Sequence, residues 1–310
     1  YSSPVLGLIF LRFAEARFAT LRLSLETEGA SSRRGSRAED PTAYHAKGVV
    51  FLPTEARFDY LLSLPESENV GSKVNSAMRE IERYNPQLAG VLPKTYNLFG
   101  STLLKELLKK VSEIPASLDY DAFGRIYEYF LGAFAKTEGQ GGGEFYTPGS
   151  IVRLLTEVIE PYHGRILDPA CGSGGMFVQA ARYMHSHNAS ESDLMKFRCY
   201  GVEKEPDTVK LAKMNLLLNN VRGEITEANS FYADPYNAVG QFDYVMANPP
   251  FNVDEVLVER VQEDDRFNAY GVPRNKAKSS KKKESDKKET VPNANYLWIG
   301  YFATALNDTG

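Results

Sequence analysis

The sequence has 310 residues, of which 43% are hydrophobic and 25% are charged, as is ordinary for a globular protein with one large domain or two smaller ones. Its net charge of −4 argues against a protein that binds nucleic acid without a partner, because such proteins usually carry a basic surface. The two cysteines, Cys171 and Cys199, are too few for a disulfide framework and lack neighbours at metal-ligand spacing, so we expect no metal site and a cytoplasmic location.

Residues 1–138 are predicted to form a mainly helical domain. The apolar run 5–11 is followed at once by charged residues, so it is too short to span a membrane and is predicted to be a buried helix. Apolar residues at three- and four-residue intervals indicate further helices at 74–84, 103–111 and 122–134. Residues 26–47 are rich in Ser, Gly and Arg, which predicts a loop.

Residues 139–310 are predicted to form an α/β domain that opens with a glycine-rich joint at 139–143. Beyond the joint, short apolar strands alternate with helical stretches, and this alternation predicts βαβ units in a Rossmann-like parallel sheet. Ligands of such sheets bind beyond the carboxyl ends of the strands. The expected strands are 165–168, 199–203 and 242–247, the last counted as the fourth of the sheet, and the expected helices are 150–159, 175–184, 206–219 and 292–306.

Residues 274–290 are dominated by Lys, Ser, Asp and Glu, with no apolar residue able to anchor a fold. This composition predicts a solvated, mobile loop. The alternative is a lysine-rich flap that contacts the phosphates of a nucleic acid.

The first motif that carries chemistry is the strand-to-helix turn Asp168-Pro169-Ala170-Cys171-Gly172-Ser173-Gly174-Gly175. Its glycines let a ligand approach the backbone closely, and it lacks the spacing of dinucleotide-binding and phosphate-binding loops. Asp168, at the carboxyl end of a strand, suits a cation or an amine and would repel a pyrophosphate. Glu203 ends the next strand, where a carboxylate can accept hydrogen bonds from two ribose hydroxyls. Together they indicate a cationic, adenosine-bearing cofactor such as S-adenosylmethionine.

The second motif is Asn248-Pro249-Pro250-Phe251, directly after the strand at 242–247. Two successive prolines cannot continue a strand, so they fix a rigid turn. That turn would hold the Asn248 amide oxygen and the Pro249 carbonyl as converging acceptors for an exocyclic NH₂ group, which stabilises positive charge that develops on its nitrogen. Phe251 supplies a ring face on which a flipped-out base could stack.

These two motifs, with Glu144-Phe145-Tyr146-Thr147-Pro148 ahead of both, resemble the amino-methyltransferases of DNA in the γ order of N6-adenine enzymes. The helical segments 4–11 and 85–93 are similar to those of the modification (M) subunit of type I restriction–modification systems. The resemblance covers essentially the whole chain. It implies an adenine-specific DNA methyltransferase that uses S-adenosylmethionine, acts on double-stranded DNA, and works with a specificity subunit and a restriction subunit, with two modification subunits per specificity subunit.

The resemblance also implies roles for individual residues. It assigns cofactor contact to Glu144, Phe145, Tyr146, Thr147, Pro148, Gly149, Asp168, Pro169, Ala170, Gly172, Ser173, Gly174, Gly175, Glu203, Asn229 and Ser230, and catalysis to Asn248, Pro249, Pro250 and Phe251. Relatives often carry an Asp after the third strand that contacts the cofactor adenine, and Asn229-Ser230 stands at the matching place here. The helical domain is expected to dock on the specificity subunit and on DNA.

Three alternatives stay open at this point. An amine or amide such as cytosine N4 or a protein glutamine could be the acceptor, or the chain could be a non-catalytic assembly module that binds cofactor. Methylation at cytosine C5 would need a cysteine nucleophile, and neither Cys171 nor Cys199 is placed for that role. A methyltransferase sheet normally has seven strands, so we expect this sheet to be truncated at its C-terminal end, with strand four an exposed edge.

Overall fold

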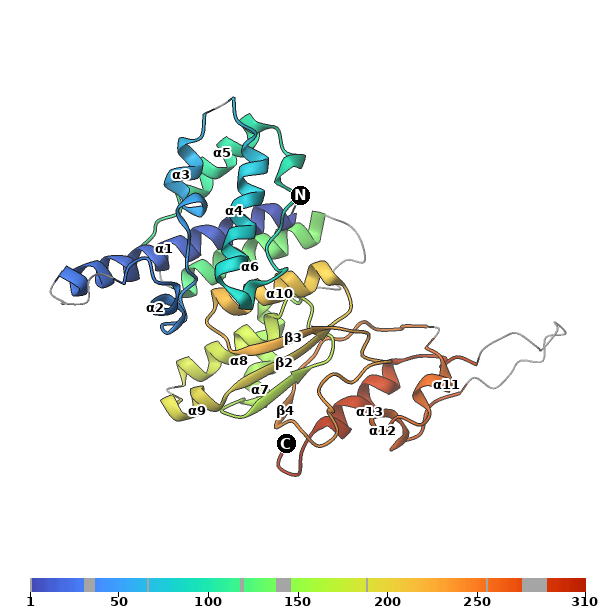
Figure 1. Cartoon of the computed structure of the whole chain (residues 1–310). Coiled ribbons are helices and arrows are strands. Elements are labelled where there is room, and N and C mark those ends of the chain that lie inside the picture. Colours follow the sequence, from blue (N-terminus) through green and yellow to red (C-terminus); the bar gives the residue numbers. More distant parts are fainter. Residues whose placement is uncertain are drawn as a thin grey trace. The chain divides into compact units, whose positions relative to one another are not determined.

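The computed structural model describes residues 2–30, 37–65, 67–117, 120–137, 146–187, 189–254, 256–274 and 289–310. The chain divides into two compact units, residues 1–137 and 138–310 (Figure 1). Within the described ranges, no helix is both long and apolar enough to cross a bilayer. The Lys-rich stretch lies outside these ranges except at its ends, where Arg274 Nη1 and Glu289 Oε2 form an ion pair at 3.6 Å.

The first unit is helical, as predicted. Its main helices are α1 (Ser2–Ala30), α2 (Pro41–His45), α3 (Phe58–Ser63), α4 (Val70–Tyr84), α5 (Ser101–Ser112) and α6 (Tyr120–Thr137), with short 3₁₀ turns η1 (Thr54–Ala56), η2 (Pro86–Leu88) and η3 (Tyr96–Leu98). Leu6, Leu8 and Phe10 of α1 are at most 1% exposed, which confirms the prediction of a buried helix. Burial of this apolar stretch against α5 and α6 stabilises the unit.

The prediction of a loop at 26–47 is wrong at both of its ends. Helix α1 continues to Ala30, and α2 begins at Pro41. Asp40 caps α2, since its side chain accepts a hydrogen bond from Thr42 N at 3.0 Å, and proline at the first position of a helix has no N–H to leave unsatisfied. These local signals outweigh a composition that is otherwise typical of a loop.

The second unit contains a four-stranded parallel sheet in the order β3-β2-β1-β4 (Figure 1). The strands are β1 (Arg165–Asp168), β2 (Arg198–Glu203), β3 (Gly223–Glu227) and β4 (Tyr244–Val245), and the helices are α7 (Gly149–Ile159), α8 (Gly175–Ser186), α9 (Glu191–Lys196), α10 (Pro206–Leu218), α11 (Val258–Val261), α12 (Asp265–Asn268) and α13 (Asn295–Ala305). This confirms the predicted Rossmann-like sheet, which a helical N-terminal region precedes in the sequence.

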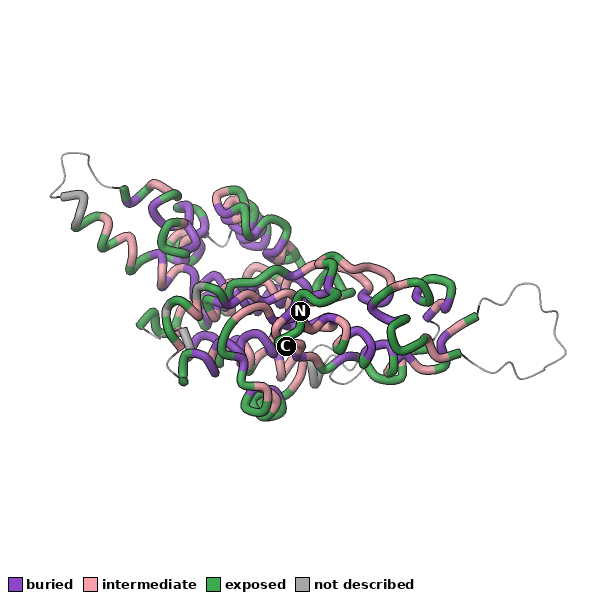
Figure 2. Tube along the Cα trace, turned by 90° about the horizontal axis from the view of Figure 1, so that it is seen from below, coloured by how far each residue is buried: buried purple, intermediate pink, exposed green. Residues whose placement is uncertain are grey.

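Two hydrophobic clusters cover the two faces of this sheet, because successive residues of a strand point to opposite faces. Ile166 of β1 packs with apolar residues of α7, α8 and α10. Leu167, its neighbour, packs with Phe267 of α12 and with Leu297 and Tyr301 of α13. Buried and exposed positions alternate along the helices in Figure 2, as expected when one side of a helix rests on a core.

Strand β4 is the last strand of the sheet among the described residues, as predicted, but only two residues of 242–247 belong to it. Phe242 instead forms an isolated parallel bridge with Leu306, the residue after α13. The N–H of Phe242 donates to Ala305 O, and the N–H of Asn307 donates to Phe242 O. The residues just before β4 are therefore paired, whereas Tyr244 and Val245 form the edge.

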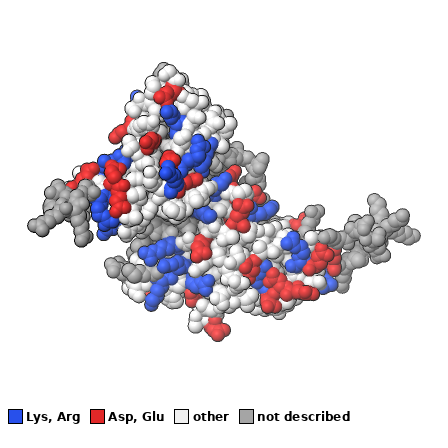
Figure 3. All heavy atoms as spheres, in the orientation of Figure 1, with Lys and Arg blue, Asp and Glu red and all other residues white. Residues whose placement is uncertain are grey.

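Charged side chains of both signs are interspersed over both units on the face drawn in Figure 3. This agrees with the small net charge of the sequence. Among the described residues on that face, acidic side chains stand beside basic ones, whereas proteins that bind nucleic acid unaided usually carry a broad basic area.

Candidate functional site

The predicted site residues of the sheet unit follow the carboxyl ends of neighbouring strands. Strand β1 pairs in parallel with β2 on one side and with β4 on the other. Strand β2 pairs in parallel with β3. Because parallel strands end at the same edge of a sheet, Asp168, Glu203, Asn229 and the corner that begins at Asn248 all leave from one edge. The structure thus brings these sequence-predicted positions together.

The glycine turn after β1 is fixed by its own backbone. Cys171 N donates to Val202 O of β2 at 3.0 Å, and Gly174 N donates to Cys171 O at 2.8 Å. Gly172 and Gly174 have φ angles of 51° and 78°, in the left-handed region that favours glycine. A Cβ on Gly174 would lie 2.8 Å from Leu216 Cδ1, so the turn packs closely on α10 and a larger residue would displace the end of the Leu216 side chain.

The acidic groups at the ends of β1 and β2 are buried or half-buried. Asp168 is 1% exposed and accepts a hydrogen bond from Ala170 N at 3.0 Å. Burial raises the pKa of Asp168 to about 8, and the negative charge of Glu203 adds to the rise. Glu203 accepts hydrogen bonds from Gly172 N at 3.1 Å and Glu205 N at 2.8 Å, and burial raises its pKa as well.

Neither carboxyl forms an ion pair within the parts of the chain that the structure describes. Two acidic groups without a compensating cation destabilise the ligand-free site, because burial disfavours their charged form and raises their pKa above the ordinary value. A cationic ligand would supply the missing charge, whereas a pyrophosphate would add to the repulsion. The electrostatics therefore fit a ligand with an ammonium or sulfonium group.

The loop after β3 lies beside the glycine turn. Ala228 N donates to Glu203 O at 2.9 Å, which keeps this loop next to the end of β2. Asn229 Oδ1 accepts from Phe231 N at 3.0 Å, and its Nδ2 has no partner among the described residues. The Ser230 hydroxyl is buried and donates to Pro169 O, so it ties the loop to the turn. Contact of Asn229 and Ser230 with a cofactor stays a prediction.

The corner after β4 presents two unengaged acceptors. Met246 N donates to Leu167 O at 3.0 Å, so the chain leaves the sheet next to β1. Asn248 is exposed and its Nδ2 donates to Thr147 Oγ1 at 3.3 Å. In the described parts of the chain, no donor reaches Asn248 Oδ1 or the Pro249 carbonyl. Phe251 is 65% exposed, so its ring is available for stacking.

The hydrogen bond from Asn248 reaches the predicted E-F-Y-T-P segment. Tyr146 and Thr147 are half-buried, Pro148 caps α7, and Gly149 is the first residue of that helix. Glu144 and Phe145 lie outside the described residues. One part of this segment therefore lies at the edge of the sheet where the other predicted residues meet.

Sequence reasoning missed the residues that hold the Asn248 corner in place. Trp298 Nε1, on α13, donates to Pro250 O at 3.2 Å. Asn252, whose φ is 58°, accepts on its Oδ1 from Asn293 Nδ2 at 3.1 Å, while its N–H donates to Asn295 Oδ1 at 2.9 Å. The pattern Asn293-Ala294-Asn295, ahead of the one tryptophan in the sequence, was a signal that could have been found.

A parallel sheet of this order, with a glycine turn after β1, defines the Rossmann-like fold of S-adenosylmethionine-dependent methyltransferases. The solved methyltransferase subunit of a type I restriction-modification system from Streptococcus thermophilus has this fold, with a TM-score of 0.76 at 19% identity over 100% of this chain and 68% of that one. A modification subunit of a putative type I restriction enzyme from Vibrio vulnificus gives a TM-score of 0.51 at 23% identity over 82% and 56%.

The sequence profile described as N-6 DNA Methylase matches residues 118–281, and that of the HsdM N-terminal domain matches residues 1–113. The chain belongs to the N-6 DNA Methylase family. This confirms the resemblance found in the sequence.

The curated relatives are longer than this chain. The type I restriction enzyme MjaIX methylase subunit of Methanocaldococcus jannaschii is 37% identical over 97% of this chain and 54% of its own length. The HindI methylase subunit of Haemophilus influenzae is 33% identical over 78% of this chain and 53% of its own length. The chain thus spans about half the length of these relatives.

Proposed function

We propose that this chain is the methyltransferase part of a type I modification subunit, which transfers a methyl group from S-adenosylmethionine to the N6 amine of adenine in DNA. One observation carries the proposal. The uncompensated carboxyls of Asp168 and Glu203 and the free acceptors of the Asn248 corner lie at the same edge of the sheet, on three neighbouring strands. A donor that carries positive charge and an acceptor amine would therefore meet there.

The chain's own residues suit the cofactor part by part. Asp168 would face the ammonium or sulfonium charge, and Glu203 would accept hydrogen bonds from the ribose hydroxyls. The residues Ser173, Gly174 and Gly175 would allow close approach of the methionine part, since two of them lack a Cβ. Asn229, half-buried after β3, has an amide that can pair with an adenine edge.

The acceptor nitrogen would be prepared at the Asn248 corner. When bound, S-adenosylmethionine supplies a methyl group on its sulfonium. Asn248 Oδ1 and the Pro249 carbonyl would accept hydrogen bonds from the two N–H groups of the adenine amine, which draws the nitrogen lone pair out of conjugation and stabilises the positive charge that develops on it. Phe251 would stack on the extruded base and hold it in line with the donor. The bond from the methyl carbon to sulfur would break as the bond to nitrogen forms, which leaves a neutral thioether, and the methylated nitrogen would then lose one proton to solvent. No covalent bond to the protein is needed.

The acceptor and the partners follow from the family. The match to the N-6 DNA Methylase family supports adenine N6 over cytosine N4 and over a protein glutamine. The curated relatives are named as methylase subunits of type I restriction enzymes, which supports a place in a complex of several subunits. The proposal includes double-stranded DNA as the substrate, a specificity subunit and a restriction subunit as partners, and two modification subunits per specificity subunit. The helical unit, which matches the HsdM N-terminal domain, would dock on the specificity subunit and on DNA. Two free, buried thiols support a cytoplasmic location.

The test is to co-express the whole protein with its specificity subunit and to map N6-methyladenine in the DNA. We expect Asn248→Ala to lower the rate of methylation by about 10²–10³-fold, the usual effect of removing one preorganised polar group. Gln241→Ala is the matched control, because it removes an exposed amide just before β4, at the opposite end of that strand.

Calorimetric titration completes this experiment. Asn248→Ala should bind S-adenosylmethionine within about threefold of the wild type, because its amide faces the acceptor and not the cofactor. A wild-type protein that binds the cofactor but methylates no DNA would support the non-catalytic assembly module instead. Methylation of cytosine or of a protein would contradict the adenine assignment.

A further inference from the structure

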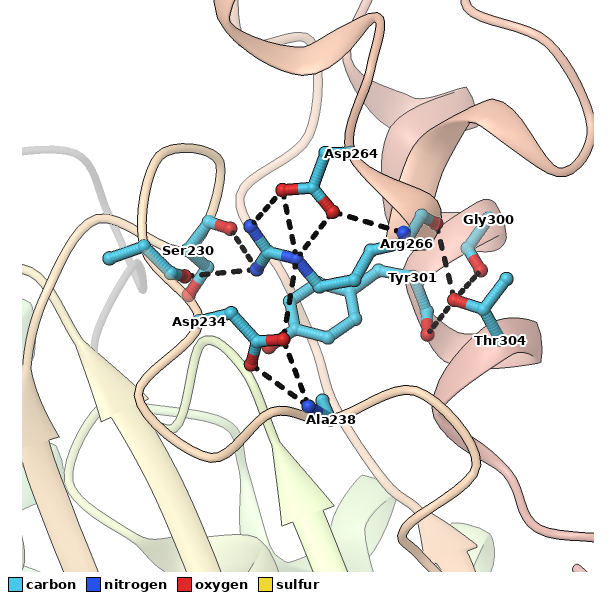
Figure 4. Close-up of polar contacts among 9 residues, drawn as sticks. Ser230, Asp234, Ala238, Asp264, Arg266, Gly300, Tyr301 and Thr304 are labelled. Carbon is cyan, nitrogen blue, oxygen red and sulfur yellow. Dashed lines mark hydrogen bonds and ion pairs between the residues drawn. The ribbon is translucent and has the colours of Figure 1, made fainter.

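Arg266 of α12 is a charged residue in an almost fully buried place. Its side chain is 2% exposed, which is rare for arginine unless the guanidinium is paired and hydrogen-bonded. Its Nη2 donates to Asp264 Oδ2 at 2.6 Å, and its Nε donates to Asp264 Oδ1 at 3.0 Å (Figure 4). A second carboxylate, that of Asp234, forms an ion pair with Nε at 3.8 Å.

The surroundings of this guanidinium keep it charged. Burial alone would lower the pKa of Arg266, but the hydrogen bonds and the charge of Asp264 raise it above its ordinary value. The rings of Phe267 and Tyr301 lie 4.9 and 4.8 Å from the guanidinium carbon, close enough for cation–π attraction. A neutral side chain at this position would leave Asp264 and Asp234 without their cation.

Two further donors of Arg266 hold the loop that follows β3. Its Nη1 donates to Ser230 O and to Ala233 O, each at 2.9 Å (Figure 4). Asp234 also belongs to this loop and accepts from Ala238 N at 2.9 and 3.0 Å. The sheet fixes the other side of the loop, because Tyr236 Oη donates to Gly201 O of β2 at 2.9 Å. The segment that starts with Asn229 is thus held between the sheet and one buried cation.

Helix α13 connects this loop to the Asn248 corner. Tyr301 stacks on the guanidinium, and Thr304 Oγ1 donates to Arg266 O at 3.2 Å. Trp298 lies one turn earlier on the same helix. Its ring centroid is 4.5 Å from that of Phe231 in the loop, while its Nε1 donates to Pro250 O in the corner. Helix α13 therefore contacts both the loop after β3 and the Asn248 corner.

We propose that Arg266 and Trp298 are positioning residues for methyl transfer. Arg266 sets the loop after β3, so that Asn229 lies where the adenine of the cofactor is bound. Trp298 sets the corner, so that Asn248 Oδ1 and the Pro249 carbonyl hold the acceptor amine. This inference rests on the proposed function and names residues that touch neither the cofactor nor the base.

The first test compares Arg266→Lys with Arg165→Lys in the whole chain. Both arginines lie against a pair of aromatic rings, since Arg165 lies 4.7 Å from Tyr200 and 4.9 Å from Phe242, but Arg165 begins β1, at the opposite end of that strand from the site. Lysine keeps the charge in each case and loses the planar fork of donors. Affinity for S-adenosylmethionine is measured by calorimetry and stability by thermal unfolding.

We expect Arg266→Lys to weaken cofactor binding by about tenfold, the equivalent of one charge-assisted hydrogen bond, and Arg165→Lys to change it by less than about twofold. Both variants should lose thermal stability, so stability alone does not produce the difference. Equal affinity in Arg266→Lys and wild type would overturn the role of Arg266. A wild type that binds no S-adenosylmethionine would overturn the proposed function itself, and this inference with it.

The second test is Trp298→Phe, which keeps an aromatic ring against Phe231 and removes the N–H donor to Pro250. We expect the rate of adenine methylation to fall by about tenfold while the dissociation constant of the cofactor stays within about threefold. A merely structural role would change both quantities or neither. An unchanged rate, or an equal loss in both quantities, would contradict the assignment of Trp298 to the corner.

Discussion

The charged residues at the two ends of strand β1 differ in the partners that the folded chain gives them. At the amino end, the Arg165 guanidinium stacks on Tyr200 and Phe242. The N–H of Arg165 donates to Asp243 Oδ2 at 2.7 Å, and the other oxygen of that carboxylate accepts from Asn307 Nδ2 at 2.9 Å. The Asp243 carboxylate thus has a hydrogen-bond donor on each oxygen. The Arg165 guanidinium contacts two rings and Gln241 Oε1, although its Nε has no hydrogen-bond partner among the described residues.

At the carboxyl end, only three residues away, Asp168 is buried and forms no ion pair with any described residue. Its pKa is raised to about 8, and Glu203 on the next strand adds negative charge. The interactions at the amino end therefore stabilise the fold. The buried carboxyl at the other end lowers the free energy of unfolding, and a bound cation would offset this loss. Such a difference is expected where function and stability compete for the same residues.

The substitution with the largest expected effect on this difference between the two ends of β1 is Asp168→Asn. It keeps a side chain of similar size and removes the acid. We expect affinity for S-adenosylmethionine to fall by about 100-fold, because the carboxylate would no longer meet a positive charge. The ligand-free chain should in turn become more stable, with a midpoint of thermal unfolding higher by about 2–4 °C, because the fully buried carboxyl without a cation is then removed. Calorimetry and thermal unfolding measure the two effects.

The control is Asp243→Asn at the amino end, where the carboxylate accepts two hydrogen bonds. Here the signs should reverse, since the amide cannot accept on both sides. Thermal stability falls, and cofactor affinity does not change. If Asp168→Asn instead lowered stability and left affinity intact, the two ends of β1 would not differ in the way described.

The site could be predicted from sequence where one short motif carries the chemistry. Asp168 and Glu203 end predicted strands and Asn248 directly follows one, and parallel strands bring their carboxyl ends together without further information, so the sequence predicts that these residues lie at one edge of the sheet. The sequence also indicated the longer helices, but not the short helices α2, α3, α9, α11 and α12 or the bounds of the strand β3. A local signal was overlooked at Asp40, whose cap on α2 ends the predicted loop early.

The supporting residues could not be predicted, because their partners are distant in the chain. Arg266 follows two aspartates and so resembles a surface residue, yet it is buried by contacts with Ser230 and Ala233, more than 30 positions away. Trp298 was expected only as part of a helix, and its bond to Pro250 depends on how α13 packs. The predicted strand 242–247 was too long because Phe242 pairs with Leu306.

The pH dependence of cofactor binding tests whether the Asp168 carboxyl faces a positive charge. With a pKa of about 8, Asp168 is mostly protonated at pH 7 in the ligand-free chain. A bound cation favours the carboxylate, so binding should release close to one proton, and affinity should rise with pH by up to about tenfold per unit below pH 8. Titrations between pH 6.5 and 7.5, in buffers of different ionisation enthalpy, measure both quantities.

The sign for stability is opposite. The folded state holds the Asp168 proton between the ordinary pKa of 3.8 and about 8, while the unfolded state has lost it, so this group lowers stability as pH rises through that window. Asp168→Asn should remove both the proton release and this part of the pH dependence. Binding that is independent of pH in the wild type would mean that Asp168 does not face the positive charge.

The smallest effect is expected at the amino end, in Arg165→Lys. Lysine would keep the charge but lose the contact of the guanidinium with Tyr200 and Phe242. It would also lose the hydrogen bond to Gln241 Oε1, which is 3.2 Å from Arg165 Nη1. Each cation–π contact contributes about 0.5–1 kcal/mol, so the midpoint of thermal unfolding should fall by about 2–4 °C. Cofactor affinity should stay the same within error, because nothing at this end faces the ligand. A drop in affinity without a drop in stability would show that the two ends are coupled through β1. It would contradict the view that the amino end affects stability alone and the carboxyl end affects cofactor binding.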